Sequence, residues 1–339
     1  MTLWDKNSAS LAEIQLGRNE KYLPGVALPV DWQTQVDFTK AIGGAECVLL
    51  EEIQRGRNER YLSGVALPTD WKTQTDFTKA IGGAECVLLA IPSQAFREVS
   101  GKLKGHPGIF VSVTKGIEFE TGDTMSRILR ELAPADRVVA LSGPSFAREV
   151  ALGIPTTVVC ACESDGTAKT VQGLFHRPEF RIYRSTDILG VEYGGALKNI
   201  IAIAAGVSDG LGYGDNTKAG LVTRALSEIR RLGVTCGAQA ETFSGLSGLG
   251  DLMLTCFSKQ SRNRELGERL GRGESLEKIQ ASHPKLAEGY PTARSAYRLA
   301  KEKKVSAPII DEVYAMLYEG KNPKQAVRDL ISRAFKVED

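Results

Sequence analysis

Between residues 86 and 175 the sequence alternates short apolar runs with amphipathic segments. Strands are expected at 86–91, 109–114, 137–142 and 155–161, and helices at 93–104, 121–133, 145–151 and 165–175. Such alternation is typical of parallel βαβ units with helices on both faces of one sheet. From residue 188 onward the pattern is helical, with glycine-rich joints at 210–214 and 245–250. We therefore predict an α/β domain over residues 1–187, followed by an all-α domain over residues 188–339.

The N-terminal third contains an internal repeat. Residues 13–50 and 52–89 are related by an offset of 39 and differ at only six positions. Two copies are too few for a solenoid, so a tandem duplication explains the repeat better. Residues 1–4, which precede it, have the composition of a short strand.

The glycine turn that a dinucleotide-binding domain needs is missing from the sequence. No G-x-G-x-x-G occurs in the 339 residues, and no P-loop pattern occurs either. The nearest approach, at residues 210–214, lies between helices and has the wrong final spacing. Since this turn delivers the pyrophosphate to a helix N-terminus, spacing alone predicts no dinucleotide site.

Composition narrows the class of protein. Lys and Arg number 43 against 41 Asp and Glu, so no overall charge points to nucleic acid. Six cysteines are scattered without a C-x-x-C pair, which is typical of a protein in a reducing compartment. Three histidines lie far apart in the sequence, so we expect no metal site, although the pair Cys160 and Cys162 leaves a zinc site open. No leader and no apolar run of membrane-spanning length is visible. These features predict a soluble, cytoplasmic protein.

The stretch from Gly190 to Val207 carries one lysine inside apolar sequence. Lys198 follows Gly194 and Gly195, which leave room for a close approach by another segment. Burial disfavours the charged form of a lysine, so its pKa falls and the neutral amine becomes available as a base. The alternative is a lysine at a helix end that extends its ammonium group to solvent.

Two strand ends carry groups that suit an anion. Lys115 follows the strand expected at 110–113 and could bind a phosphate or polarise a carbonyl, or it could be a solvated turn residue. Ser142, Gly143 and Ser145 lie between a strand and a helix, where backbone N–H groups can face an anion. A helix cap by either serine is an equally good interpretation.

Two further segments of the helical region carry polar groups. Asp251 follows the glycine-lined run 247–250 and could accept from a substrate hydroxyl, hold Lys198 in place, or form a turn. Ser261, Arg262 and Asn263 begin a helix, where the helix dipole, N–H groups and a guanidinium reinforce one another. A phosphate site is favoured there over a solvated basic turn. Together these features predict an enzyme that acts on a small phosphorylated alcohol or ketone.

The chain resembles the bacterial NAD(P)-dependent glycerol-3-phosphate dehydrogenase family. The resemblance rests on the segments TLW, YLPGVALP, VLLAIPSQAF, SVTKGIE, LSGPSFAREV, GGALKNIIAIAAG, SGLGDLMLTC, QSRNRELG and AEGYPTA. It implies a Rossmann-like dinucleotide-binding domain, a helical substrate domain, NAD or NADP as cofactor, and reduction of dihydroxyacetone phosphate to sn-glycerol 3-phosphate for phospholipid synthesis. It also implies a homodimer, while the charge balance and the absence of a long apolar run predict neither nucleic-acid binding nor a membrane span.

The resemblance implies a set of site residues. Lys198 would be the catalytic proton donor and acceptor. The substrate contacts would be Lys115, Gly143, Ser145, Lys198, Asp251, Ser261, Arg262 and Asn263. The cofactor contacts would be Lys6, Lys115, Ala147, Arg262, Leu286 and Glu288. Asp5, beside Lys6, could accept from a ribose hydroxyl, so the preference for NAD or NADP stays open.

The chain departs from this family at its N-terminus. Family members begin with a strand, a G-x-G-x-x-[GA] turn and a helix, which here are missing before Thr2. Cys47–Leu50 could fill the vacant place in the sheet with Glu52–Asn58 as its helix, but Glu51 and Glu52 would then repel a pyrophosphate. We therefore expect weak or no dinucleotide binding. The alternatives are a non-catalytic protein that binds a phosphorylated ligand, and a β-hydroxyacid dehydrogenase of the 6-phosphogluconate type.

Overall fold

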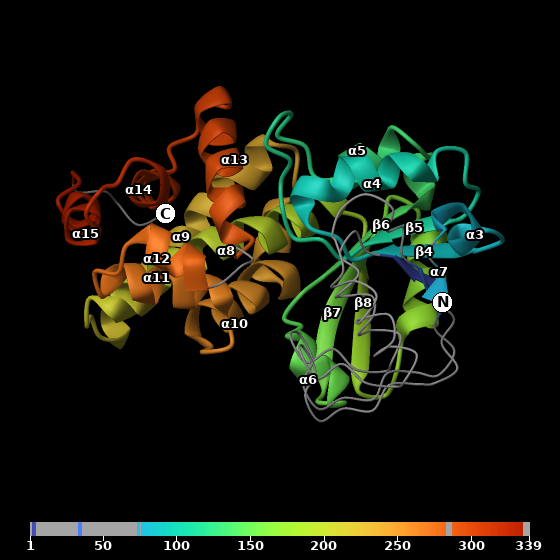
Figure 1. Cartoon of the computed structure of the whole chain (residues 1–339), viewed down its shortest axis with the longest axis horizontal. Coiled ribbons are helices and arrows are strands. Elements are labelled where there is room, and N and C mark those ends of the chain that lie inside the picture. The colour runs from blue at the N-terminus through green and yellow to red at the C-terminus, as the bar shows by residue number, and fades with distance from the viewer. Residues whose placement is uncertain (1, 5–32, 36–72, 75, 283–286, 335–339) are drawn as a thin grey trace. The chain divides into compact units, whose positions relative to one another are not determined.

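The computed structural model describes residues 2–4, 33–35, 73–74, 76–282 and 287–334. The chain divides into two compact units (Figure 1). The first unit comprises Met1–Thr114 and Met125–Ile188, and the second comprises Lys115–Thr124 and Leu189–Asp339.

The first unit is built on one eight-stranded sheet with the order β3-β2-β1-β4-β5-β6-β7-β8. Neighbouring strands run parallel except β6 and β7. The α/β prediction for this part of the chain is therefore confirmed, with one antiparallel pair added. The strands are β1 (Thr2–Trp4), β2 (Gln33–Gln35), β3 (Thr73–Gln74), β4 (Cys86–Leu89), β5 (Ile109–Ser112), β6 (Val138–Ser142), β7 (Thr156–Ala161) and β8 (Phe180–Ser185).

Helices connect these strands and cover the sheet. β4 and β5 are buried along almost their whole length, as expected for strands covered on both faces. In Figure 1, α4 and α5 lie together over the sheet. The second repeat copy contributes α3, whose first turn is capped by Asp76 through the N–H groups of Thr78 and Lys79. The helices are α3 (Phe77–Ile81), α4 (Phe96–Ser100), α5 (Met125–Arg130), α6 (Ala147–Ala151) and α7 (Asp165–Phe175).

The antiparallel pair β6 and β7 follows from the short connection between them. That connection contains only α6, and a five-residue helix spans about 7.5 Å, whereas the five residues of β6 span about 17 Å. Such a helix cannot carry the chain back along the sheet, as a parallel crossover requires. The edge strand β8 has no counterpart in our sequence analysis, because its apolar residues alternate with arginines and a tyrosine that stay partly or fully exposed.

Both copies of the repeat place a strand in the sheet. β2 belongs to the first copy and β3 to the second, and they pair in parallel with Thr34 opposite Thr73 and Gln35 opposite Gln74. These partners are 39 residues apart, so equivalent positions of the two copies face each other. β1 pairs directly with β4, so β1 occupies the place in the sheet that was suggested for Cys47–Leu50. Cys47–Leu50 and Glu52–Asn58, suggested above for that place, lie outside the described residues.

The second unit is helical, as predicted. Its central helix is α8, where Ala196, Leu197, Ile200, Ile201 and Ile203 have no exposed surface. A helix that is apolar on all sides belongs in a core, and the other helices surround it in Figure 1. The helices are α8 (Ile188–Gly210), α9 (Asp215–Thr235), α10 (Asp251–Phe257), α11 (Arg262–Gly271), α12 (Leu276–Ser282), α13 (Gly289–Glu302), α14 (Pro308–Tyr318) and α15 (Pro323–Ile331).

No uninterrupted apolar run of membrane-spanning length was expected, and α8 is an apolar helix interrupted by charged residues such as Glu192 and Lys198. Its 23 residues are long and apolar enough to cross a bilayer, and it is the one such helix within the described ranges. However, 94% of its most apolar window is buried inside the protein. The apolar surface of α8 is therefore used in the core of the second unit.

Candidate active site

Lys198 lies in the middle of α8, and its side chain is only 7% exposed. Its Nζ donates to Asp251 Oδ1 at 2.6 Å and to Thr255 Oγ1 at 2.7 Å. Burial lowers the pKa of Lys198 to about 8, although the Asp251 carboxylate opposes the change. The expected pKa reduction is thus present, and the alternative of a solvent-reaching lysine at a helix end is wrong.

Asp251 joins two lysines. Its other oxygen, Oδ2, accepts from Lys115 Nζ at 2.6 Å, and the carboxylate is 1% exposed. Burial alone would raise the pKa of Asp251, but the two ammonium groups outweigh burial and hold this pKa below its ordinary value. Lys115 is therefore paired with a buried carboxylate, and the solvated-turn alternative for it does not hold.

The position of Asp251 depends on a glycine of α8. A side chain at Gly194 would place its Cβ 2.5 Å from the backbone oxygen of Ser247. This contact lets the turn Leu246–Gly250 approach α8 one helical turn before Lys198. Asp251 follows that turn as the first residue of α10, and Thr255 follows it by one turn on the same helix. The close approach expected at Gly194 is confirmed, and the approaching group is backbone of the same chain.

Two asparagines link α8 to α11. Asn263 Nδ2 donates to Asn199 Oδ1 at 3.0 Å, and Asn263 Oδ1 accepts from the backbone N–H of Gly289 at 2.8 Å. Asn199 Nδ2 reaches the backbone oxygen of Lys115 at 3.4 Å. The amide of Asn263 therefore retains one N–H for another partner.

The start of α11 has the arrangement predicted from its sequence. Ser261 caps the helix, since its Oγ accepts from the backbone N–H of Arg264 at 3.2 Å. Arg262 is the first residue of the helix and is exposed, whereas Asn263 is buried. A helix N-terminus with an exposed guanidinium is suited to bind a phosphate.

The predicted caps at Ser142 and Ser145 were wrong. Phe146 occupies the N-cap position of α6 and makes no side-chain cap. Ser145 Oγ donates instead to the backbone oxygen of Gly143 at 3.1 Å, and Ser142 Oγ is buried with no hydrogen-bond partner among the described residues. Gly143 has a φ of +143°, and a Cβ there would lie 3.0 Å from the Cα of Val158. Close packing against β7 therefore accounts for this glycine.

The remaining sequence-predicted residues are dispersed. Ala147 is the first residue of α6 in the first unit, and Glu288 is the N-cap of α13 in the second. Lys6 and Leu286 lie outside the described residues.

Sequence reasoning missed Thr255 and assigned no role to Asn199. Both contact residues of the predicted set, Thr255 through Lys198 and Asn199 through Asn263. The signal for Thr255 was its spacing of four from Asp251, which places both on one face of a helix. Asn199 had no such signal, because its partner is 64 positions away in the sequence.

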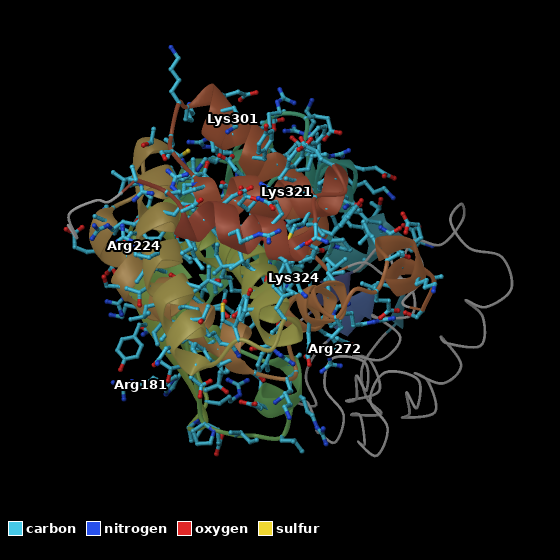
Figure 2. The ribbon with its side chains drawn as sticks, turned by 90° about the vertical axis from the view of Figure 1, so that its left-hand side faces the viewer. Arg181, Arg224, Arg272, Lys301, Lys321 and Lys324 are labelled. Carbon is cyan, nitrogen blue, oxygen red and sulfur yellow. The ribbon has the colours of Figure 1, made fainter. Side chains whose placement is uncertain are left out.

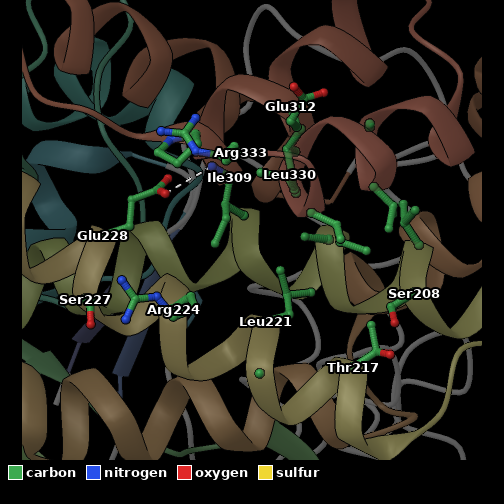
Figure 3. Close-up of a pocket in the computed structure, with 18 of the residues that line it drawn as sticks. Ser208, Thr217, Leu221, Arg224, Ser227, Glu228, Ile309, Glu312, Leu330 and Arg333 are labelled. Carbon is green, nitrogen blue, oxygen red and sulfur yellow. Dashed lines mark hydrogen bonds between the residues drawn. The ribbon is translucent and has the colours of Figure 1, made fainter. Parts of the chain in front are cut away.

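A separate cleft of about 860 Å³ lies between α9, α14 and α15 (Figure 3). Its walls combine apolar residues such as Leu221 and Leu330 with Arg224 and Arg333. Glu228 also lines this cleft, and its carboxylate accepts from the backbone N–H groups of Ile309 and Ile310. None of the lining residues belongs to the Lys198 cluster.

Comparison with known proteins gives consistent matches. The chain matches the families described as NAD-dependent glycerol-3-phosphate dehydrogenase N-terminus, over residues 49–168, and C-terminus, over residues 187–328. It is 51% identical over 256 residues to a glycerol-3-phosphate dehydrogenase [NAD(P)+] from Syntrophotalea carbinolica, covering 74% of this chain and 77% of that protein. A relative of the same name from Anaeromyxobacter dehalogenans is 47% identical over 345 residues, covering 100% and 92%. The solved glycerol-3-phosphate dehydrogenase of Coxiella burnetii is 31% identical, with a TM-score of 0.84 over 98% of both chains.

Proposed function

Because the chain belongs to the NAD-dependent glycerol-3-phosphate dehydrogenase family, we propose that it interconverts dihydroxyacetone phosphate and sn-glycerol 3-phosphate, the glycerol backbone of phospholipids. The observation that carries this proposal is the buried pair of Lys198 and Asp251. A lysine with a pKa of about 8 can give up and regain a proton near neutral pH. Asp251 of this pair also contacts Lys115, and Lys198 lies on α8, the helix whose Asn199 contacts Asn263 at the start of α11.

In this proposal Lys198 is the proton-transfer group. NADH or NADPH, when bound, would supply the hydride to C2 of dihydroxyacetone phosphate. The carbonyl oxygen would then gain negative charge and take a proton from the Nζ ammonium of Lys198. In the reverse direction the neutral amine accepts the hydroxyl proton. Asp251 and Thr255 hold Nζ in place through their hydrogen bonds, so little reorganisation accompanies the transfer.

The phosphate of the substrate would bind at the start of α11. Ser261, Arg262 and Asn263 supply a helix N-terminus, a guanidinium and an amide N–H there, and Lys115 adds a second cation in the same unit. On the family resemblance we also assign Gly143 and Ser145 to the substrate. Lys115, Ala147, Arg262 and Glu288 are assigned to the dinucleotide on the same basis, together with Lys6 and Leu286.

The N-terminal part of this chain does not fit the dinucleotide in the usual way. β1 occupies the place beside β4, and the residues that follow it in the sequence are Asp5, Lys6 and Asn7, without a glycine. In a Rossmann fold a glycine turn after the first strand lets the backbone reach the pyrophosphate, and the sequence after β1 contains no such turn. We propose that NAD and NADP bind this chain more weakly than they bind relatives with the turn.

Fluorescence titration with NADH and NADPH, followed by dihydroxyacetone phosphate, tests the cofactor. Calorimetric titration with glycerol 3-phosphate tests the substrate site separately. We expect glycerol 3-phosphate to bind both the wild type and Lys198→Met, and any NADH oxidation to be lost in Lys198→Met. Tight binding of NADH would overturn the proposed weakness, and failure to bind glycerol 3-phosphate would overturn the proposed substrate.

We also propose, from the family resemblance, that the chain is a cytoplasmic homodimer. The near-neutral net charge of +2 supports a small-molecule enzyme that does not bind nucleic acid. Light scattering after size-exclusion chromatography tests the dimer, since a mass of 36.7 kDa would identify a monomer.

A further inference from the structure

A second group of charged side chains lies in the same unit as Lys198. It consists of Asp209, Lys218, Arg264 and Glu268, and we call it the brace. The guanidinium of Arg264 is 8% exposed and uses all three nitrogens. Nη1 donates to Asp209 Oδ2 at 2.5 Å, Nη2 to Glu268 Oε2 at 2.8 Å, and Nε to the backbone oxygen of Ser258 at 3.0 Å. Arg264 is therefore fully engaged within the protein.

The brace connects four helices. Asp209 lies near the end of α8, and its other oxygen contacts Lys218 Nζ of α9 at 2.5 Å. The same ammonium group lies 5.2 Å from the ring centroid of Phe257, the last residue of α10. Glu268 also pairs with Arg272, which Figure 2 labels at the surface.

Backbone contact between α8 and α11 fixes the two helices side by side. A Cβ on Gly206 of α8 would lie 1.9 Å from the backbone oxygen of Arg264, and a Cβ on Gly267 of α11 would lie 1.9 Å from that of Ile203. Neither helix can slide or rotate without breaking these contacts. The packing of these two backbones therefore determines how far Lys198 of α8 lies from Arg264 and Glu268 of α11.

Arg264 also closes the turn that precedes α11. Its side chain binds the oxygen of Ser258 at the start of this turn, and its backbone N–H binds Ser261 Oγ at the end. Residues 258–261 are thus held at both ends by one residue. This turn leads directly into Arg262 and Asn263.

We propose that Arg264 and Asp209 are positioning residues that fix the turn of residues 258–261, and with it Arg262 and Asn263, relative to Lys198. This inference rests on the proposed function for the role of the turn, but the positioning itself can be tested without a ligand. The brace acts through Ser258, Ser261 and the α8–α11 contact, and it does not touch the substrate.

Hydrogen exchange on the free protein tests the positioning. In Arg264→Met, Arg264→Lys and Asp209→Asn we expect amides of residues 259–264 to exchange at least about tenfold faster, while residues 193–205 around Lys198 keep their protection. Arg264→Lys retains the charge and is the milder change if Arg264→Met fails to fold. Arg269→Met is the matched control, since Arg269 lies on the same helix and pairs with Glu274 and Ser282. Unchanged exchange in the turn, or equal acceleration around Lys198, would overturn the proposal.

Calorimetry with glycerol 3-phosphate tests the consequence for binding. We expect Arg264→Lys and Asp209→Asn to weaken affinity by about 10- to 100-fold, the range expected when a binding group is misplaced by about 1 Å. The double variant Arg262→Ala/Arg264→Lys should lose little more than Arg262→Ala, because Arg264 acts through the turn that carries Arg262. Additive losses would overturn positioning. A wild type that binds no glycerol 3-phosphate would refute the proposed function, while the exchange experiment still decides the positioning.

Discussion

At the scale of single residues, the low pKa of Lys198 results from two opposing effects. Removal of the ammonium group from water lowers the pKa, and the carboxylate of Asp251 raises it again. Lys115, held 2.6 Å from the other oxygen of Asp251, lowers the pKa of Lys198 further. The carboxylate of Asp251 is thus shared by two ammonium groups. Because Lys115 also contacts this carboxylate, the attraction between Asp251 and Lys198 does not cancel the effect of burial on the pKa of Lys198.

We predict that Lys198 titrates with a midpoint of about 8, and that Asp251→Asn moves this midpoint lower. The substitution removes the charge that favours the ammonium form, while Lys115 stays nearby. NMR of chain labelled with ¹³C at lysine Cε measures the midpoint without cofactor, and Lys198→Met identifies the resonance. A midpoint that stays the same or rises in Asp251→Asn would contradict the electrostatic account.

The sequence was informative about Lys198 because the apolar residues around it predict that this part of the helix is buried. A single charge among Leu197, Ile200 and Ile201 must be desolvated if the helix is in the core. The partners of Lys198 were harder to predict. Asp251 is 53 positions away in the sequence, and it reaches Lys198 because the turn before it packs against Gly194. Local sequence cannot show such contacts, so the sequence left three roles open for Asp251.

At the scale of elements, α14 is capped by another helix. Ala307 at its N-cap position provides no side-chain cap. Glu228 of α9 takes that part, because its two oxygens accept from the N–H groups of Ile309 and Ile310 at 3.0 and 2.9 Å. A carboxylate at a helix N-terminus is favoured by the helix dipole. Burial nevertheless raises the pKa of Glu228 to about 7, against the effect of these two N–H groups.

We predict that Glu228 makes the protein less stable as the pH rises toward 7. The native state keeps the proton up to about pH 7, whereas the unfolded state releases it near 4.5. The free energy of unfolding due to this group therefore falls between these two pH values, by an amount of the order of 3 kcal/mol. Urea unfolding across this range should show the slope in wild type and in Ser227→Ala but not in Glu228→Gln. Parallel pH profiles for all three would refute the prediction.

Glycines inside helices of the second unit differ in the space around them. A Cβ at Gly206 of α8 would overlap the backbone of α11, whereas a Cβ at Gly220 of α9 would meet nothing within 4 Å. We predict that Gly206→Ala destabilises the protein by more than about 2 kcal/mol, because one of two packed backbones must move. Gly220→Ala should stabilise it by about 0.5–1 kcal/mol through helix propensity. Thermal unfolding of both variants provides the measurement, and a stable Gly206→Ala would contradict the close approach.

Element types were predictable where the apolar pattern was strong. The alternation after residue 86 and the helices after residue 188 follow from periodicity that burial imposes. The orientation of β7 and the edge strand β8 did not follow, because one depends on the length of α6 and the other has an exposed face. The pairing of two strands depends on the length of the segment that connects them and on the strands beside them, so the local sequence pattern of one strand does not predict it.

At the scale of the whole molecule, both copies of the repeat contribute to one sheet. β1 stands beside β4, and the two repeat copies supply the two strands on its other side. The sheet is therefore parallel from β3 through β6. The second unit, which holds the Lys198 cluster and the start of α11, contains no part of the repeat. The duplication is thus confined to the first unit.

We predict that a chain lacking residues 14–52 still folds and binds glycerol 3-phosphate as the full chain does. This deletion joins Glu13 to Ile53, which recreates the sequence of one intact copy and leaves the connection after β1 unchanged in length. The segment Thr73–Gln74 can then pair with β1, since Thr34 and Gln35 occupy the same repeat positions.

The expected cost of this deletion is small for a physical reason. One short edge strand is lost, while the connection to β4 becomes shorter, and halving a connection recovers only about 0.6 kcal/mol of closure entropy. We therefore expect a melting temperature within a few degrees of the full chain and the same affinity in calorimetry. Deletion of residues 78–116, which is equal in length but does not correspond to one repeat unit, is the control and should abolish folding because it removes β4 and β5. Aggregation of the 14–52 deletion would show that both copies are needed, and that the second copy cannot replace the first beside β1.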